Sequence, residues 1–354
     1  MSNLPTSFSA PLWNPEQPSD RRSFQEAWSF KFVDRTAPPG SQRGIWIHLN
    51  LLVSQNGFKR ITETWAQIAS RDASREVSNR ILKQTYDISA FKFLPPASLR
   101  IADCCITGNS QAGTTTGIIH SKGNTFEWDL KFTATEAGSS ASDYELVPES
   151  LRSLSIVHDS AVTICPDLLF SGTTKLNGQI SHWKKAPGIQ RHLSGPGFAR
   201  SWVWGHCNIF TSEAGDESPF IFEGLSARTR LFKSAATLKF STFYFFYRGQ
   251  PYFFNSLWDS IRAKSRTSLT EWNFQVDQGE LSFHGQLKAA HKDFAGLTFE
   301  DTSGSLLYTA QSRLSDLRIQ VYRAGKLESS FVSLGNASFE AGSPEKNPYV
   351  PLMV

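Results

Sequence analysis

The sequence predicts an all-β protein, built as two tandem antiparallel β-barrels or sandwiches that are related by internal duplication. Residues 46–50 (W-x-H-x-N) recur as residues 204–208, displaced by 158 positions in a chain of 354. Residues 126–131 parallel residues 283–288 at an offset of 157. Matches in one order at nearly one displacement indicate a repeat of about 160 residues.

Chain length and composition agree with two strand-rich halves. A chain of 354 residues exceeds the size at which single hydrophobic cores usually stop growing, so two domains are expected. Aromatic residues make up 13% of the chain and charged residues only 19%. This balance favours strands and large apolar pockets.

Strand signals follow period-two alternation and are separated by turns such as Asn56-Gly57 and Asn177-Gly178, which tolerate positive φ. In the first half we expect strands at residues 28–32, 44–54, 61–69, 99–106, 116–120, 125–133 and 152–157. In the second half we expect them at residues 201–210, 219–227, 237–247, 271–276, 280–288, 304–311, 317–323 and 327–333. Residues 71–83 and 256–265 are the exceptions, which fit short helices or polar connections.

The chain is expected to divide into four segments. Residues 1–22, with four prolines, predict an irregular arm, and residues 23–197 and 198–340 predict the two β-domains. The crossover between the halves is placed in the Gly/Pro-rich segment 186–197. Residues 341–354 carry three prolines and are expected to form a loose tail.

Charge and hydropathy exclude several protein classes. A formal charge of +4 without a long basic run argues against nucleic-acid binding. The first 25 residues lack the apolar core of a signal peptide, and no window reaches 18 consecutive apolar residues. A cytoplasmic location is therefore expected.

The sequence contains no motif that indicates a metal or a nucleotide cofactor. The four cysteines, at positions 104, 105, 165 and 207, have no CxxC spacing and are expected to be buried free thiols. His182, His192 and His206 lie near the crossover, but their spacing of ten and fourteen does not indicate a metal site. GxGxxG, GxxxxGK[ST], HExxH and GxSxG motifs are absent from the sequence, so neither a metal nor a nucleotide cofactor is expected.

The W-x-H-x-N segments place aromatic and polar side chains on one strand face. One face of the second segment is expected to hold Trp202, Trp204, His206, Asn208 and Phe210, and the other Val203, Cys207 and Ile209. Trp46, His48 and Asn50 form the matching face of the first segment. Buried His and Asn side chains need partners, so they either satisfy one another while filling a barrel or face a ligand.

Four glutamates lie in strand contexts beside aromatic or β-forming residues: Glu26, Glu63, Glu127 and Glu223. Burial would raise the pKa of such a carboxyl, as a general acid requires, whereas on a solvated face it would be an ordinary surface group. Glu63 and Glu223 follow the two W-x-H-x-N segments at similar distances, so they are treated as repeat-related. These two glutamates and His206 are the candidate proton donors.

A family resemblance rests on four blocks. Residues 176–192 (LNGQISHWKKAPGIQRH) and 201–210 (SWVWGHCNIF) resemble the inter-domain junction of the lipocalin-like hydroxyneurosporene synthase (carotenoid 1,2-hydratase), AttH and tocopherol cyclase group. Residues 122–130 resemble its mid-domain strand, and residues 26–30 its opening strand. The resemblance implies two lipocalin-like β-domains with an apolar pocket near their junction. It assigns no catalytic residue, because members of the group differ in the acid that they use.

These observations together predict a pocket that binds a long apolar ligand of the isoprenoid, polyene or polyketide kind. Its expected wall consists of Trp46, His48, Asn50, His192, Trp202, Trp204, Asn208 and Phe210. Neighbours of the resembled group carry out cofactor-free hydration, cyclisation and pericyclic reactions, so hydration, cyclisation or isomerisation is the expected activity. The alternative is a non-catalytic lipid or isoprenoid carrier. Either protein would gain access to its ligand through peripheral contact with a membrane, and the sequence leaves the oligomeric state open.

Overall fold

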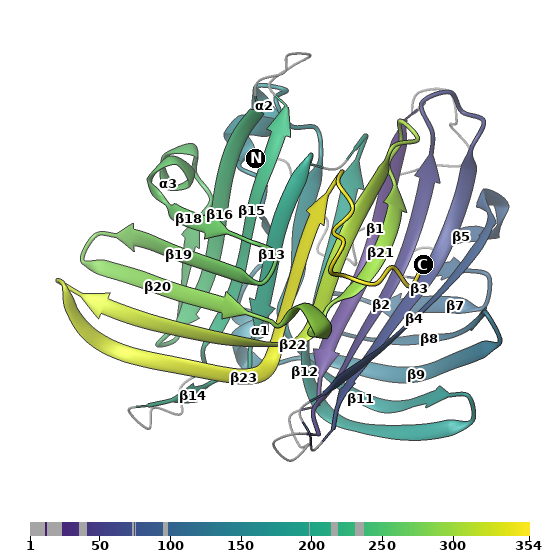
Figure 1. Ribbon diagram of the computed structural model, residues 1–354, viewed down its shortest axis with the longest axis horizontal. Helices are drawn as coiled ribbons and strands as arrows, with labels where there is room; N and C mark the ends of the chain where they lie inside the picture. Colours follow the sequence, from purple (N-terminus) through teal and green to yellow (C-terminus); the bar gives the residue numbers. More distant parts are fainter. Residues whose placement is uncertain are drawn as a thin grey trace.

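The computed structural model describes residues 11–12, 23–34, 41–72, 74, 76–94, 98–197, 199–213, 219–230 and 237–354. Most of this part of the chain lies in two antiparallel sheets that stand beside each other (Figure 1). The expected all-β fold is therefore confirmed. The predicted N-terminal arm lies outside the described residues except for Pro11 and Leu12.

The first sheet contains 12 strands in the order β4-β3-β2-β1-β12-β11-β9-β8-β7-β6-β5, with β10 paired to β11. Their bounds are β1 (Phe24–Val33), β2 (Arg43–Val53), β3 (Arg60–Arg71), β4 (Val77–Asp87), β5 (Phe91–Leu94), β6 (Ser98–Ile101), β7 (Cys104–Gly108), β8 (Ala112–Ser121), β9 (Asn124–Ala134), β10 (Tyr144–Glu145), β11 (Ser160–Leu176) and β12 (Gln179–Gly195). Three short helices belong to this half: η1 (Ile88–Ala90), α1 (Glu136–Ser140) and α2 (Glu149–Ser153).

The second sheet contains 11 strands in the order β17-β16-β15-β13-β23-β22-β20-β19-β18, with β14 paired to β23 and β21 to β22. Their bounds are β13 (Ser201–Cys207), β14 (Thr211–Ser212), β15 (Ile221–Arg230), β16 (Thr237–Tyr247), β17 (Gln250–Phe254), β18 (Lys264–Thr267), β19 (Glu271–Gln278), β20 (Leu281–Lys288), β21 (Ala295–Glu300), β22 (Leu306–Arg323) and β23 (Lys326–Ser343). Its helices are α3 (Leu257–Arg262) and η2 (His291–Asp293).

Both sheets share one strand order. In each, a four-stranded meander joins a long hairpin through its first strand, and a second meander continues from the other strand of the hairpin. The long hairpins are β11–β12 and β22–β23, and β5 and β6 extend the first sheet alone. This common order supports the internal duplication. The domain bounds at residues 197 and 340 stay predictions.

The sequence repeat matches this topology only in part. The offset of 157 relates equivalent hairpins, which close at Ser121–Asn124 and Gln278–Leu281. The W-x-H-x-N match instead relates β2 to β13, whose counterpart by position is β1. Glu63 on β3 and Glu223 on β15 are therefore not equivalent, and the expectation that they are repeat-related is wrong. Both motif strands face the opposite half of the molecule, and this common environment accounts for their similar sequences.

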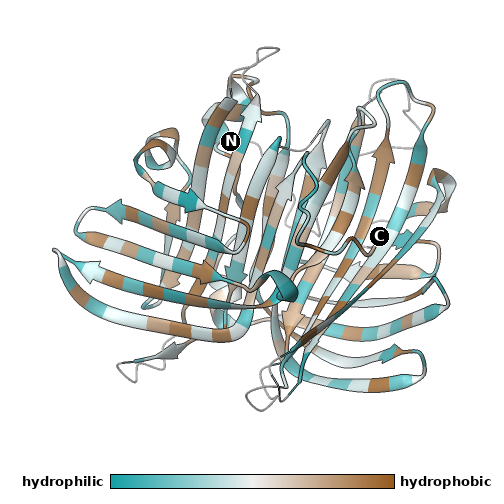
Figure 2. Cartoon of the chain, viewed as in Figure 1, coloured by the Kyte–Doolittle hydropathy of each residue, from teal (hydrophilic) through white to brown (hydrophobic). Residues whose placement is uncertain are grey.

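Both sheets bury apolar side chains on two faces, and Figure 2 shows the resulting brown bands along the strands. The inner face of the first sheet holds Ile45, Ile47 and Leu49, and that of the second holds Val203 and Cys207. Two further apolar clusters lie between the halves. One joins β2 and β3 to β21 and β22, and the other packs residues 137–161 on β13, β15 and β16.

Two local predictions are wrong. Residues 77–83, expected to form a short helix or a polar connection, instead belong to β4 (Val77–Asp87), which pairs along its whole length with β3. Its polar composition reflects its place at the edge of the sheet, where Ser78, Arg80, Thr85 and Asp87 are exposed. Residues 152–157 are not a strand, because Pro148 begins α2 and a turn follows it.

Other elements differ at their ends. The strand expected at 99–106 divides into β6 and β7 at a tight turn, where Ala102 has φ 49°. The strand expected at 201–210 ends at Cys207. A short helix within residues 256–265 is confirmed as α3, which Ser256 and Asp259 cap reciprocally.

The crossover and the tail also differ from expectation. Residues 186–195 complete β12, so the link between the sheets is confined to residues 196–200, of which residue 198 is outside the described part. The C-terminal tail is not loose. Met353 N donates to Gly296 O, and Thr298 N on β21 donates to Val354 O. Although the tail contains three prolines, its last residues retain enough backbone donors and acceptors to bond to β21 of the second sheet.

Candidate functional site

The motif faces of β2 and β13 both look into the interface between the sheets. Trp46 lies 4.8 Å from His48 and 6.5 Å from Phe299 of β21, measured between ring centroids. Ile45 and Ile47, on the opposite face of β2, fill the inner core. The expected alternation is confirmed, and the alternative in which the motif residues fill their own barrel is wrong for these strands. A strand that is apolar on both faces is buried on both sides.

Trp204 lies at the centre of a buried charge network, which we define as Lys31, Arg191, Glu223 and Glu340. Its side chain is 1% exposed, and its Nε1 donates to Glu223 Oε1 at 2.7 Å. Lys31 Nζ lies 3.6 Å from the Trp204 ring centroid, and Arg191 Cζ lies 4.5 Å from it. The indole ring therefore contacts two cations that come from the other sheet.

Glu223 on β15 is fully buried and receives bonds from both halves of the chain. Tyr144 OH and Thr163 Oγ1 donate to its Oε2 at 2.6 and 2.7 Å. Arg191 Nε lies 3.3 Å from Oε1, an ion pair whose angle is too poor for a hydrogen bond. With both oxygens occupied, this carboxylate is suited to holding Trp204 and Arg191 in place.

Glu340 on β23 is the second carboxylate of the network. Its Oε2 lies 3.1 Å from Lys31 Nζ, and Trp202 Nε1 donates to its Oε1 at 3.0 Å. Burial alone would raise its pKa, but Lys31, Arg313 and the Trp202 N–H outweigh that effect and lower the pKa to about 2. Burial lowers the pKa of Lys31 well below its usual value, and Glu340 only partly offsets this. Glu340 is therefore the firmly ionised member of the pair.

A cavity of about 100 Å³ lies beside this network, between the two sheets. We call it the inter-sheet cavity. Its apolar wall consists of Ala27, Val147, Val157, Ala161, Leu193, Ala199, Trp202, Trp204, Leu225, Ala227 and Phe240. Its charged lining consists of Glu26, Asp159, Arg191 and Glu340, and Gln25, Asn50, Ser160, Ser194 and Thr229 add neutral polar groups. The arrangement of an apolar cavity with a few convergent polar groups is typical of small-molecule sites.

Asp159 is one of the titratable groups in this cavity that the sequence did not indicate, with Arg191 and Glu340. Burial raises its pKa to about 7, although Gly197 N donates to its Oδ1 at 3.0 Å and opposes that shift. Its carboxyl can therefore hold or release a proton near neutral pH. Asp159 lies just before β11 in a segment without strand alternation, so no sequence pattern marked it.

Glu26 and His192 form a buried pair at the edge of the cavity. His192 Nε2 lies 2.7 Å from Glu26 Oε1, to which Leu12 N also donates at 2.8 Å. The His192 ring stacks on Trp28 at a centroid distance of 5.2 Å. His192 thus adjoins the cavity through Glu26, which lines it.

The three predicted proton donors do not line the inter-sheet cavity. His206 donates from Nε2 to Pro166 O at 2.9 Å, and burial lowers its pKa to about 4, so it is neutral at pH 7. Glu63 lies 2.8 Å from Lys83 Nζ and accepts bonds from Thr85 and Asn50. Both carboxylate oxygens of Glu223 already accept hydrogen bonds. These contacts favour structural roles for His206, Glu63 and Glu223, and the catalytic role of these residues stays a prediction.

The predicted ligand-binding residues fall into two groups. Asn50, Trp202 and Trp204 line the inter-sheet cavity, whereas Trp46 and His48 pack in the adjoining interface. Burial lowers the pKa of His48 to about 3.

Two further predicted residues lie beyond the end of β13. Asn208 donates to Asp167 Oδ1 at 2.6 Å and to Gly188 O at 3.2 Å, and so ties this strand to the first sheet. Phe210 does not share the Trp204 face. It packs on Phe220 and Phe331 in the second core, because strand alternation ends at Cys207.

The residues that the structure describes contain no group of three or more His, Cys, Asp or Glu side chains placed to hold a metal ion. None of the helices within them is long and apolar enough to cross a membrane.

Comparisons with known proteins identify the fold of this chain but not its family. No protein-family model matches the sequence, and no curated protein matches it significantly. The chain is similar to the crystal structure of a putative AttH from Nitrosomonas europaea, with a TM-score of 0.51, 11% identity and coverage of 96% of this chain and 99% of that one. It is also similar to kievitone hydratase from Nectria haematococca, with a TM-score of 0.47, 12% identity and coverage of 89% and 88%. At these identities, the likeness to the putative AttH shows that the two chains share the lipocalin-like fold and does not extend to their chemistry.

Proposed function

We propose that this protein binds an apolar small molecule in the inter-sheet cavity and catalyses the addition of water to a C=C bond, or its reversal, without a cofactor. The observation that carries the proposal is the cavity itself, where Asp159 and Glu340 line one space together with eleven apolar residues. The cavity of about 100 Å³ suits one isoprenoid or aromatic group, and the rest of a longer ligand would extend outside it.

The two carboxyl groups suit different tasks. Asp159, with a pKa raised to about 7 by burial, acts as the general acid. Glu340, whose pKa is about 2, remains ionised and stabilises positive charge on the substrate. Trp202 adds an aromatic ring to the same cavity, and an aromatic face attracts a developing carbocation.

The proposed reaction is balanced in atoms and charge. The Asp159 proton bonds to one alkene carbon with the π electrons, which leaves a cation at the other carbon. A water oxygen then bonds to that carbon, and the excess proton returns from the oxygen to the Asp159 carboxylate. The sum is alkene plus water giving an alcohol, and the same groups would serve a cyclisation or isomerisation in which the cation loses a proton instead.

The test begins with native mass spectrometry of the purified protein to identify an apolar compound that co-purifies. Turnover of that compound, or of alkenes of the same class, is then measured against pH. Activity should fall as the pH rises through about 7, and Asp159→Asn should lower kcat by roughly 10²-fold to 10⁴-fold. Asp143→Asn, an exposed residue of the same region, is the control and should retain full activity.

Other results would change the proposal. Full turnover by Asp159→Asn would contradict its role as the acid and return attention to Glu63, Glu223 and His206. If the wild type bound apolar compounds but transformed none of them, the protein would be a lipid or isoprenoid carrier.

A further inference from the structure

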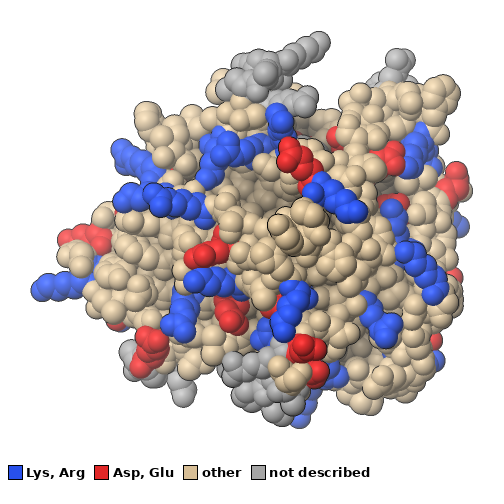
Figure 3. Space-filling view, viewed as in Figure 1, with Lys and Arg blue, Asp and Glu red and all other residues tan. Residues whose placement is uncertain are grey.

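A second cavity opens at the end of the second sheet, separate from the site proposed above. Its volume is about 430 Å³, within the range of about 300 to 1,000 Å³ that is typical of small-molecule pockets. We call it the outer cavity. It shares only Trp202 and Ala227 with the inter-sheet cavity. Figure 3 shows a hollow near the centre of this face, with basic and acidic side chains around it.

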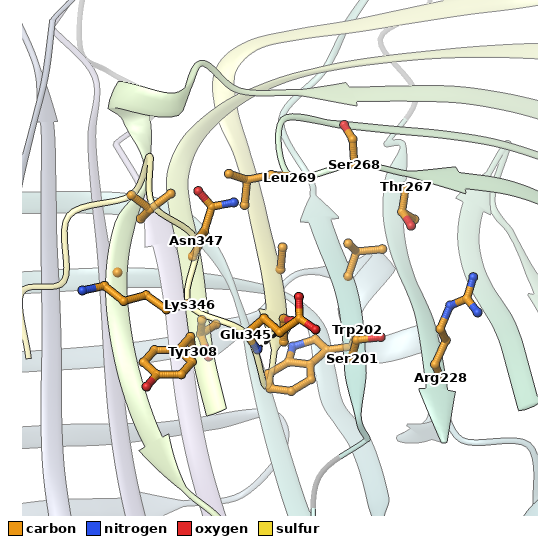
Figure 4. A pocket seen from close by; sticks show the side chains of 18 of the residues that line it. Ser201, Trp202, Arg228, Thr267, Ser268, Leu269, Tyr308, Glu345, Lys346 and Asn347 are labelled. Carbon is orange, nitrogen blue, oxygen red and sulfur yellow. Dashed lines mark hydrogen bonds between the residues drawn. The ribbon is translucent and has the colours of Figure 1, made fainter. Parts of the chain in front are cut away.

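The floor and cover of the outer cavity are mainly apolar. Val203, Ala310 and Ala341 contribute from the inner face of the second sheet. The C-terminal segment covers it with Val350 and Leu352, and backbone bonds from this segment to Gly296 hold it in place. In Figure 4, Trp202 lies at the centre of the cavity, with Arg228 on one side and Tyr308 and Lys346 on the other.

The rim carries an unusual pair of cations. Arg228 on β15 and Lys239 on β16 are directly opposite partners in the antiparallel pairing, and both line the cavity. Like charges directly opposite each other destabilise a sheet. Burial, and after it the neighbouring Arg228, lowers the pKa of Lys239, whose Nζ donates to Ser265 O at 2.5 Å. An anion held between them would relieve this repulsion.

Neighbouring groups define the chemistry of that anion. Hydroxyl groups of Ser201 and Thr267 line the same side of the cavity and can donate hydrogen bonds, whereas Ser268 Oγ already donates to Glu271 O at 3.2 Å. Glu345 also lines the cavity and is its acidic member, so the rim has two more cations than carboxylates when Lys346 is counted. A ligand that fits the outer cavity would therefore have a planar anionic group at one end and an apolar body.

We infer that the outer cavity binds a chain carboxylate of the fatty-acid kind, with its carboxylate between Arg228 and Lys239 and its chain along Trp202, Leu269 and Val350. A guanidinium pairs well with a carboxylate through two parallel hydrogen bonds. This site is independent of the proposed hydration, because its charged groups lie outside the inter-sheet cavity.

The test is calorimetric titration of the full chain with dodecanoate below its micelle concentration, and with dodecanol as the uncharged match. Dodecanoate should bind at one site, and dodecanol at least about tenfold more weakly, since a charged hydrogen bond is worth roughly that factor. Arg228→Ala and Lys239→Met should each weaken dodecanoate binding at least about tenfold. The control is Arg318→Ala, an exposed arginine outside the cavity, which should leave the affinity unchanged.

Two more variants separate this site from the other cavity and from general effects on folding. Glu345→Gln should tighten dodecanoate binding, because it removes the negative charge at the rim. Ala341→Leu should fill the outer cavity and block binding, whereas Ala161→Leu fills the inter-sheet cavity and should leave binding intact. Equal affinities for dodecanoate and dodecanol, or loss of binding in Ala161→Leu alone, would overturn the inference.

Discussion

Replacement of Glu223 by Gln tests the buried charge network most severely. The side chain is fully buried, and Arg191, its ionic partner at 3.3 Å, is only 5% exposed. Glutamine keeps an oxygen for the Trp204 N–H but removes the charge that compensates Arg191. Breaking a buried ion pair in this way costs about 3 to 5 kcal/mol, because a desolvated charge is left without its partner.

The assay is urea unfolding at pH 7, followed by tryptophan fluorescence and far-ultraviolet circular dichroism together. Coincident transitions are required for a single free energy of unfolding. Glu127→Gln is the matched control, since Glu127 pairs with Lys175 at 3.0 Å where both side chains are about two-fifths exposed. Such a surface pair is worth about 0 to 1 kcal/mol.

A double-mutant cycle with Arg191→Met isolates the pair itself. Once Arg191 is absent, Glu223→Gln leaves no unpaired cation, so the two changes together should cost at least about 1 kcal/mol less than the sum of the single changes. A cost below about 1 kcal/mol for Glu223→Gln alone, or strictly additive costs, would refute this account of the network.

Three further predictions concern stability and reactivity. The free energy of unfolding should fall as the pH drops from about 6.5 to about 4, because burial lowers the pKa of His48 to about 3 and of His206 to about 4, so the unfolded chain takes up protons that the folded chain excludes. His48→Gln should reduce that slope by up to about 1.4 kcal/mol per pH unit in urea titrations, and an unchanged slope would contradict the assignment. In native protein at pH 8, an alkylating reagent should modify Cys105 well before the other three thiols, because burial raises the pKa of those thiols to about 11 or 12. The label on each cysteine is measured by mass spectrometry, and equal labelling of all four would contradict this prediction. Gly342→Ala should lower the urea midpoint of unfolding, because a Cβ there would lie 2.3 Å from an indole ring. Gly197→Ala is the control, since its Cβ would meet nothing within 4 Å and should leave the midpoint unchanged. Similar midpoints for both variants would argue against the packing described.

Local patterns in the sequence predicted the strands and their faces well. Period-two alternation identified the buried and interface faces of β2 and β13, and a short helix was one of the two possibilities for residues 256–265, where α3 lies. Alternation failed where tertiary pairing decides the structure. The polar residues of β4 form a strand because β3 is available to pair with them, and no local propensity indicates this.

The sequence predicted some residues of the candidate site and missed others. Trp202, Trp204 and Asn50 could be found because they lie on an aromatic strand face. The Lys31–Glu340 pair could not, since its members are 309 positions apart and lie on different sheets. Asp159 was missed for a related reason, because its altered pKa comes from burial by segments that are distant in the chain.

The central claim is that the inter-sheet cavity is the binding site for an apolar ligand, and titration with all-trans-retinol tests it most directly. Retinol absorbs where tryptophan emits, so quenching of the fluorescence of the ten tryptophans measures binding to the protein, and variants that fill one cavity each assign it to a site. We predict saturable quenching by the wild type and by Ala341→Leu, and at least about tenfold weaker binding by Ala161→Leu, a loss of about 1.4 kcal/mol. Equal affinities for the wild type and Ala161→Leu, or quenching that never saturates, would contradict the account.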